Sequence, residues 1–290
     1  MTTVRSDLRA RAESLGHALP PLLVEAERLA ATVIMGEHGR RQAGRGDEFW
    51  QYRAAGPGDP ARLIDWRRSA RSDSHYVRER EWQAAQSILL WVDPSRGMTF
   101  ASDRSCPAKG DRARLLALAL AVLLLRGGEN VGLLGITRPR GGRVQLDHML
   151  TALMADSEEE DFAEPRADST GGDWIVLMSD FLGPLEGVER TVAFGAGHGA
   201  RGAILQILDP AEEDFAFHGR MILESMTGRL WHETRQAGAL RQRYLDRLSE
   251  RKARLAELAA RAGWQFSTHH TGAPARQALL WLYHASERER

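Results

Sequence analysis

The sequence predicts an α/β protein built on a doubly wound, mainly parallel sheet, and three observations lead to this expectation. From residue 87 onward, short apolar runs alternate with helix-like stretches, which is the rhythm of strand–helix–strand units. The runs are apolar throughout, as expected of strands buried on both faces; they cover residues 87–92, 131–137, 174–178 and 202–208. Oxygen-bearing side chains follow three of these runs, and sheets of this kind bind ligands beyond the carboxyl ends of their strands.

The helices of this region follow from apolar periodicity and from end signals. They are expected over residues 111–126, 146–154, 185–196, 240–262 and 274–284. The first of them is apolar nearly all round, which indicates a deeply packed helix. The long helix before Gly263 is amphipathic, the glycine ends it, and residues 264–268 form the last strand. A further strand or hairpin is expected within residues 221–231.

The N-terminal part does not follow this rhythm and predicts a helical and small β extension. Helices are expected over residues 6–16 and 21–35, strands over residues 48–54 and 74–82, and a short helix over residues 62–71. Ile64 and Trp66 are expected on the buried side of that short helix. We therefore expect residues 1–85 to form an N-terminal helical and β element packed on the core, and residues 86–290 to form the α/β domain.

Composition limits the function classes. The chain has 290 residues, 43% of them hydrophobic, and its 39 basic residues balance its 39 acidic residues. Zero net charge argues against a protein that coats nucleic acid. Cys106 is the single cysteine, which is typical of a reducing compartment. The longest apolar run, Leu115–Leu125, is far shorter than the ~20 residues of a membrane span, so we expect a cytoplasmic protein without one.

Two regions carry candidate functional residues. At the strand ends lie Asp93-Pro94-Ser95, Ser179-Asp180 and Asp209. Between residues 53 and 71 lies an Arg-rich block, whose candidate partner-binding or structural residues are Arg53, Asp59, Arg62, Asp65, Trp66, Arg67, Ser69 and Arg71. Guanidinium groups bind carboxylates through paired hydrogen bonds. The block therefore either docks the N-terminal element onto the sheet domain or, with Arg40, Arg41 and Arg45, binds an acidic partner or phosphate.

The sequence resembles a bacterial family, the domain-of-unknown-function family 58, whose core is similar to a von Willebrand factor A domain. The resemblance rests on the string Gly56-x-Gly58-Asp59-Pro60-x-Arg62-x-Ile64-Asp65-Trp66-x2-Ser69-Ala70-Arg71, on Val77-Arg78-Glu79, on the Asp93-Pro94-Ser95 loop, on Ser179-Asp180-Phe181 and on Leu208-Asp209-Pro210-x-Glu212. Together these motifs cover most of the chain, and the Arg-Asp-Trp string is the most specific of them.

The resemblance implies a partly degenerate metal-ion-dependent adhesion site. Its metal ligands would be Asp93, Ser95 and Asp180, and hard oxygen ligands of this kind suit Mg²⁺. Gly97 stands where the motif normally has a serine hydroxyl. The threonine that completes such sites is not placed by the sequence, and the candidates are Thr137, Thr151 and Thr170.

The resemblance also implies a function: a non-enzymatic protein-interaction module, an adaptor or co-chaperone that works with a MoxR-type AAA+ ATPase. Two alternatives stay open. One is a metal-dependent hydrolase that uses Asp93 and Asp180, although the sequence has no Gly-x-Ser-x-Gly and no His-Glu-x-x-His motif. The other is nucleic-acid or phosphate binding through the Arg-rich block, which the zero net charge disfavours.

Overall fold

The computed structural model describes residues 21–37, 49–56, 64–70, 75–80, 85–155, 160–166, 172–215, 221–224, 227–228, 231–234 and 237–287. The chain divides into two compact units. The larger combines Met1–Gly36 with Gln86–Arg290, and the smaller is Glu37–Ala85. The expected division into residues 1–85 and 86–290 stays a prediction. The first described helix, however, belongs to the larger unit, and the docking of the smaller unit on the core stays a prediction.

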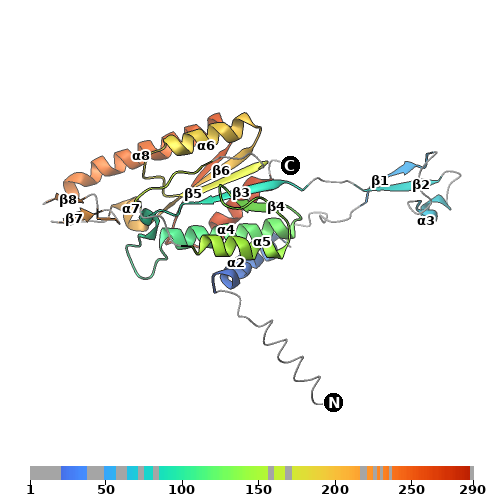
Figure 1. Ribbon diagram of the computed structural model, residues 1–290, viewed down its shortest axis with the longest axis horizontal. Coiled ribbons are helices and arrows are strands. Elements are labelled where there is room, and N and C mark those ends of the chain that lie inside the picture. The colour runs from blue at the N-terminus through green and yellow to red at the C-terminus, as the bar shows by residue number, and fades with distance from the viewer. Residues whose placement is uncertain are drawn as a thin grey trace, which may run out of the picture. The chain divides into compact units, whose positions relative to one another are not determined.

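A sheet of five parallel strands forms the centre of the larger unit, in the order β4–β3–β5–β6–β9 (Figure 1). Its strands are β3 (Ser87–Val92), β4 (Asn130–Leu133), β5 (Trp174–Ser179), β6 (Arg201–Leu208) and β9 (Gln265–His270). The chain therefore runs from β3 to one side of the sheet and then crosses to the other side at β5. This is a doubly wound order, and its switch point lies between the carboxyl ends of β3 and β5. The predicted fold class is confirmed.

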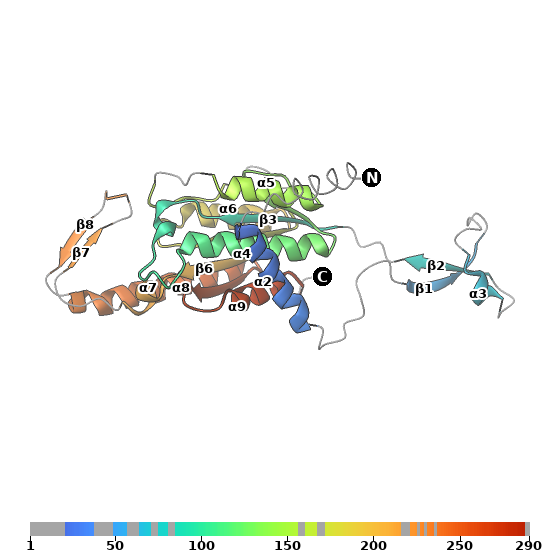
Figure 2. The ribbon, with the colours of Figure 1, turned by 90° about the horizontal axis from the view of Figure 1, so that it is seen from below.

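Helices cover both faces of this sheet (Figures 1 and 2). The helices on one face are α2 (Pro21–Glu37), α4 (Lys109–Arg126), α5 (Arg143–Leu153) and α9 (Ala275–Glu287); α6 (Glu186–Gly197) and α8 (Ala237–Arg261) lie on the other. Successive residues of β3 alternate between the two cores: Leu90 packs with the first group of helices, and Leu89 and Trp91 with the second. Both faces are thus apolar, which is why these strands show no polar alternation in the sequence.

Short elements complete the larger unit. They are the 3₁₀ turn η2 (Arg96–Thr99), helix α7 (Pro210–Asp214) and the antiparallel pair β7 (Met221–Glu224) and β8 (Trp231–Thr234). β7 lies within the range 221–231 where a strand or hairpin is expected, whereas β8 begins at the last residue of that range and continues to Thr234. Strand β4 is shorter than the sequence indicated, because the N–H groups of Ile136 and Thr137 bond back to the carbonyl of Leu133 and turn the chain away.

The smaller unit contains an antiparallel pair, β1 (Phe49–Ala54) and β2 (Tyr76–Arg80), joined through the one-turn helix α3 (Trp66–Ser69). The hydroxyl of Ser69 donates to the carbonyl of Asp65 and accepts from the N–H of Tyr76, so it ties α3 to β2. The expectation that Trp66 faces the buried side of the helix is wrong: its side chain is 57% exposed. A helix of one turn covers little surface, and the Trp66 ring makes an edge contact with His75 instead.

In the part of the chain that the structure describes, no helix combines the length and the apolar character that crossing a bilayer requires. The nearest candidate by composition is α4, and its interior position accounts for its apolar surface. Nearly all its residues between Lys109 and Leu124 are buried.

Because α4 packs in the centre of the core, truncating one of its side chains should destabilise the whole larger unit. Leu120 is fully buried, and Leu120→Ala should lower the free energy of unfolding by about 2–5 kcal/mol. Val144→Ala is the matched control, since Val144 is 66% exposed and such surface changes stay within about 0.5 kcal/mol. Urea titration followed by circular dichroism measures both. Equal losses in the two variants would contradict the central position of α4.

Candidate functional site

The site lies beyond the carboxyl ends of β3 and β5, at the switch point of the sheet. Asp93 directly follows β3, and its side chain is fully engaged. Its Oδ1 accepts a hydrogen bond from the Ser95 N–H at 2.9 Å, and its Oδ2 accepts from the Ser179 hydroxyl at 2.5 Å. The same hydroxyl oxygen accepts from the N–H of Phe181 at 2.9 Å. Asp93, Ser95, Ser179 and Asp180 are all buried, so the structure brings the three predicted metal-binding residues into one region.

The environment of Asp93 favours its neutral form. Burial, followed by the charge of Asp180, raises the pKa of Asp93 from 3.8 to about 6, while hydrogen bonds from Ser179 and Ser95 oppose the shift. A carboxyl group at a sheet switch point with a raised pKa is a candidate functional group.

A buried lysine occupies the neighbouring position. Lys109 is the first residue of α4, and its side chain is 1% exposed. Its Nζ donates to Asp180 Oδ2 at 2.6 Å and to Glu212 Oε1 at 2.6 Å. The Nζ atom also lies 5.6 Å from the centre of the Phe100 ring, within reach of a cation–π contact. The ammonium group therefore links α4, the end of β5 and α7.

The pKa values of Lys109 and Glu212 are both raised, which favours the charged form of the lysine and the neutral form of the glutamate. Burial alone would lower the pKa of Lys109, but the carboxylates of Asp180 and Glu212 outweigh it and raise that pKa above its usual value. For Glu212, burial comes first and raises the pKa, while Lys109 acts in the opposite direction. The ammonium group is therefore charged at neutral pH.

Asp209, at the end of β6, anchors the helix that supplies Glu212. It is fully buried; its Oδ1 accepts from the Ala211 N–H at 2.8 Å and its Oδ2 from the Ser102 N–H at 2.9 Å. Glu212 Oε2 reaches back to the Asp209 N–H at 3.0 Å, which closes a capping box. This reciprocal pair orients the Glu212 carboxylate toward Lys109.

One turn further along α4, Arg112 fixes the end of β9. Its Nη1 donates to the Ala273 carbonyl at 2.6 Å and its Nη2 to the Thr271 carbonyl at 2.9 Å. Nη1 also lies 2.8 Å from Nε2 of His269. Burial, then Arg112, lowers the pKa of His269 to about 4, so this histidine is neutral at pH 7 and accepts from the guanidinium. His269 thus serves the packing of the strand end.

The segment 160–161 covers the loop that follows β3. The carbonyls of Glu160 and Asp161 accept hydrogen bonds from the N–H groups of Arg96 and Gly97 at 2.9 and 3.2 Å. The Asp161 carboxylate accepts from the N–H and the hydroxyl of Thr227. A Cβ atom on Gly97 would lie 2.6 Å from the Asp161 carbonyl oxygen, closer than real Cβ contacts. The Asp161 carbonyl therefore leaves no space for a side chain at position 97, where the expected adhesion-site motif has a serine.

The carboxylate oxygens of the predicted metal ligands are engaged by protein donors in this arrangement. Mg²⁺ prefers six oxygen ligands at ~2.0–2.1 Å, yet the oxygens of Asp93 and Asp180 already accept hydrogen bonds, and one oxygen of Asp180 faces an ammonium group. Within the described residues, no group of three or more His, Cys, Asp or Glu side chains is placed to hold a metal ion. Magnesium binding through Asp93, Ser95 and Asp180 stays a prediction.

The two threonine candidates that the structure describes make other hydrogen bonds. The Thr137 hydroxyl accepts from the Leu133 N–H at 2.8 Å, which stabilises the turn after β4. The Thr151 hydroxyl donates to the Asp147 carbonyl within its own helix. Thr170 lies outside the described residues.

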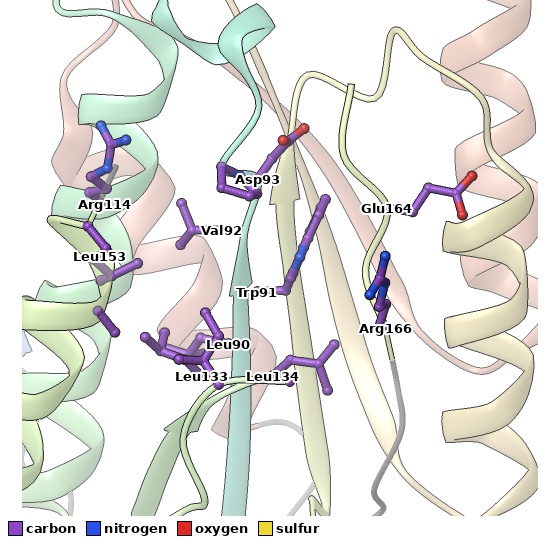
Figure 3. A pocket seen from close by; sticks show the side chains of 15 residues that line it. Leu90, Trp91, Val92, Asp93, Arg114, Leu133, Leu134, Leu153, Glu164 and Arg166 are labelled. Atoms are coloured by element: carbon purple, nitrogen blue, oxygen red, sulfur yellow. The ribbon is translucent and has the colours of Figure 1, made fainter. Parts of the chain in front are cut away.

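A cavity of about 460 Å³ lies beside Asp93, beyond the end of the short strand β4 (Figure 3). Its floor is apolar, and its rim carries Arg114 on one side and Glu164 and Arg166 on the other (Figure 3). β4 pairs with β3 only as far as Leu90. The carbonyl of Leu90 accepts from the Leu134 N–H on that side, so by strand alternation the backbone groups of Val92 face the cavity.

The structure describes only part of the Arg-rich block, and the described part shows no comparable cluster of charged groups. Within it, Asp65 is half-buried, Trp66 and Arg67 are exposed, and Ser69 is buried and structural. The backbone of Arg53 pairs with Val77 in the β1–β2 ladder. Asp59, Arg62 and Arg71, like Arg40, Arg41 and Arg45, lie outside the described residues. The partner-binding role of the block stays a prediction.

Sequence reasoning missed Lys109 and did not assign Glu212 a role. One signal was available for each. Lysine is disfavoured at the positive N-terminal end of a helix, and Lys109 is one of only two lysines in an Arg-rich chain. Glu212 follows the Asp209-Pro210 pair at the spacing of a capping box, which predicts that its carboxylate turns back toward the strand end.

Replacing Gly97 by serine, the residue that the adhesion-site motif normally has, should destabilise the protein. In Gly97→Ser, the new side chain collides with the Asp161 carbonyl, and overpacking of this kind lowers the free energy of unfolding by about 1–3 kcal/mol. Gly197→Ser is the control, because a Cβ atom there meets nothing within 4 Å. Denaturant melts of both variants test the contact; a neutral Gly97→Ser would contradict it.

Stability should also depend on pH through Asp93. A folded pKa of about 6 against 3.8 when unfolded means that the folded state binds the proton more tightly between these values. Stability therefore falls as pH rises from about 4 to about 6, by up to ~3 kcal/mol from this group. Asn does not titrate, so the stability of Asp93→Asn does not fall in this way. The difference in the free energy of unfolding between the wild type and Asp93→Asn should therefore shrink between pH 4 and pH 7. Asp103→Asn is the control, since the N–H of Ser105 lowers the pKa of that exposed carboxyl. A deficit of Asp93→Asn that is constant with pH would contradict the raised pKa.

Two solved structures are similar to this chain at low identity. One is an aerotolerance-related membrane protein from Bacteroides fragilis, with a TM-score of 0.43 and 13% identity over 70% of this chain and 100% of that one. The other is the conserved hypothetical protein BatB from Bacteroides thetaiotaomicron, with a TM-score of 0.39 and 11% identity over the same shares.

Sequence comparison finds closer relatives. The uncharacterised proteins Mb1516 of Mycobacterium bovis and Rv1480 of Mycobacterium tuberculosis are each 28% identical over 227 residues, which is 72% of this chain and 70% of theirs. The family described as "Protein of unknown function DUF58" matches residues 51–254. This match confirms the resemblance that the Arg-Asp-Trp string and the strand-end motifs indicated. Since it covers more than half of the chain, the chain belongs to that family.

Proposed function

We propose that this protein is a non-enzymatic interaction module, an adaptor or co-chaperone that works with a MoxR-type AAA+ ATPase in the cytoplasm. Membership of the family and the resemblance to von Willebrand factor A domains support an interaction role. The observation that carries the proposal is the open cavity at the end of β3, because it combines an apolar floor and charged groups on the side of β3 where β4 stops.

The cavity has the features of a groove for an extended peptide segment. The backbone of Val92 faces it beyond the last residue of β4, so a partner segment can add main-chain hydrogen bonds where β4 stops. Ile136 lines the cavity although its side chain is 67% exposed, which makes it an apolar contact available to a partner. The shape and chemistry suit an extended segment with one apolar side chain.

The charges around the cavity favour specificity over affinity. Arg114 forms an ion pair with Asp111 at 3.1 Å, and Glu164 pairs with Arg190 at 2.7 Å. Arg166 lies on the same side as Glu164 (Figure 3). Exposed pairs of this kind contribute little stability, so a partner can exchange them for its own carboxylates and basic groups. Such exchange fixes the register of a bound segment.

The proposal is tested by binding to the purified MoxR-type ATPase of the source organism. Ile136→Asp places a charge on the apolar rim and should weaken binding at least ~10-fold, about 1.4 kcal/mol. Val144→Asp is the control, because Val144 is equally exposed at 66% and does not line the cavity. Surface plasmon resonance with nucleotide-loaded ATPase measures all three proteins.

Other outcomes separate the alternatives. Equal binding by wild type and Ile136→Asp would move the docking surface away from the cavity. Absence of ATPase binding, together with metal-dependent hydrolysis of generic esters or phosphates that is lost in Asp180→Asn, would favour the hydrolase. Salt-sensitive retention of DNA would favour nucleic-acid binding.

A further inference from the structure

The Lys109 ion cluster places a cation where the carboxylates of the strand ends converge. The carboxylates of Asp180 and Glu212 come from different segments, yet each has an oxygen 2.6 Å from the same Nζ atom. The ammonium group is 1% exposed, and the Asp180 and Glu212 side chains are 6% and 15% exposed. A side-chain ammonium group in this position can compensate the charge of converging carboxylates, as a bound metal ion does in other sites.

We propose that the ammonium group of Lys109 is the resident cation of the strand-end site, in place of a divalent metal ion. The site is then closed and independent of metal. The inference does not depend on which partner the protein binds, because it concerns what holds the strand ends together.

The chemistry of an ammonium group suits this position. It is a compact positive charge with three donors and no acceptor. Two of those donors reach Asp180 and Glu212, and the Phe100 ring lies close enough to receive part of the charge. Mg²⁺ would instead require several water ligands and near-octahedral space, whereas Lys109, Asp180 and Asp93 are buried.

Neighbouring groups also favour a fixed arrangement. The second oxygen of Asp180 accepts from the Leu182 N–H at 2.9 Å, and that of Glu212 from the Asp209 N–H at 3.0 Å. The Gln206 side chain donates to the Asp180 carbonyl at 2.8 Å. Both carboxylates are thus held by backbone bonds independent of lysine, and they would stay in position if the lysine were shortened.

This leads to a direct test by substitution. Lys109→Ser removes the ammonium group and leaves two converging carboxylates with space between them. The variant should melt at a Tm about 6–12 °C below the wild type in the presence of a chelator, and added Mn²⁺ or Mg²⁺ should restore part of that loss. Calorimetry should detect saturable Mn²⁺ binding to Lys109→Ser and no saturable heat with the wild type.

The chain supplies a matched control. Lys252, the other lysine, pairs with Glu213 at 2.6 Å, but the two side chains are 29% and 32% exposed. Lys252→Ser removes an ion pair of the same length near the surface. It should shift Tm little and should gain no metal binding. If Lys109→Ser responds like Lys252→Ser, the proposal is overturned.

A measurement on the wild type covers the case in which Lys109→Ser does not fold. Acetylation of surface amines, followed by mass spectrometry, should modify Lys252 at least ~10-fold faster than Lys109, because the modification requires an accessible and deprotonated amine. Wild type and Asp93→Ala are titrated in parallel with Mg²⁺ and Mn²⁺. Equal acetylation rates of the two lysines would show that Lys109 is not buried in the cluster and would overturn the proposal. Saturable heat in the wild type that Asp93→Ala abolishes would also overturn it, because a metal would then be the cation of the site.

Discussion

One buried ammonium group holds together segments that are far apart in the chain. Lys109 begins α4, Asp180 follows β5, and Glu212 lies in α7, with separations of 71 and 103 residues from the lysine. An ion pair buried to this degree is stable only when each partner is compensated, and here the backbone N–H groups of Leu182 and Asp209 satisfy the second oxygens. Removing the lysine would therefore leave two buried carboxylates without their shared cation.

The first turn of α4 also fixes the chain that follows the edge strand β9. Lys109 ties the end of β5, and Arg112, one turn later, ties the chain that follows β9 through the carbonyls of Thr271 and Ala273. The rest of the helix is apolar and fills the core. A single helix thus supplies both the hydrophobic contacts that hold the sheet and the cations that fix its carboxyl edge.

That edge has a closed half and an open half. Over Asp93 and Gly97, the segment 160–161 pairs with the backbone and leaves no space for a side chain at Gly97. Beside Asp93, the early end of β4 leaves Val92 and an apolar cavity accessible. Lys109 lies among the carboxyl groups of the strand ends, and the neighbouring cavity is the surface that we propose for a partner. In our proposals, the Lys109 ammonium group keeps the strand ends fixed, and the cavity beside Val92 is the surface at which a partner contacts them.

The sequence by itself determined the fold class, the main strands and helices of the larger unit, and the strand-end carboxyl groups Asp93, Asp180 and Asp209, because periodicity and turn chemistry are local properties of the chain. It also carried the motifs that identify the family. Only the tertiary structure decided which groups meet at the strand ends. The pairing of Lys109 with Asp180 and Glu212, the covering of Gly97 by Asp161, and the opening beside Val92 all depend on contacts between distant segments. The exposure of Trp66 likewise depends on what lies around a one-turn helix, which helical spacing does not reveal.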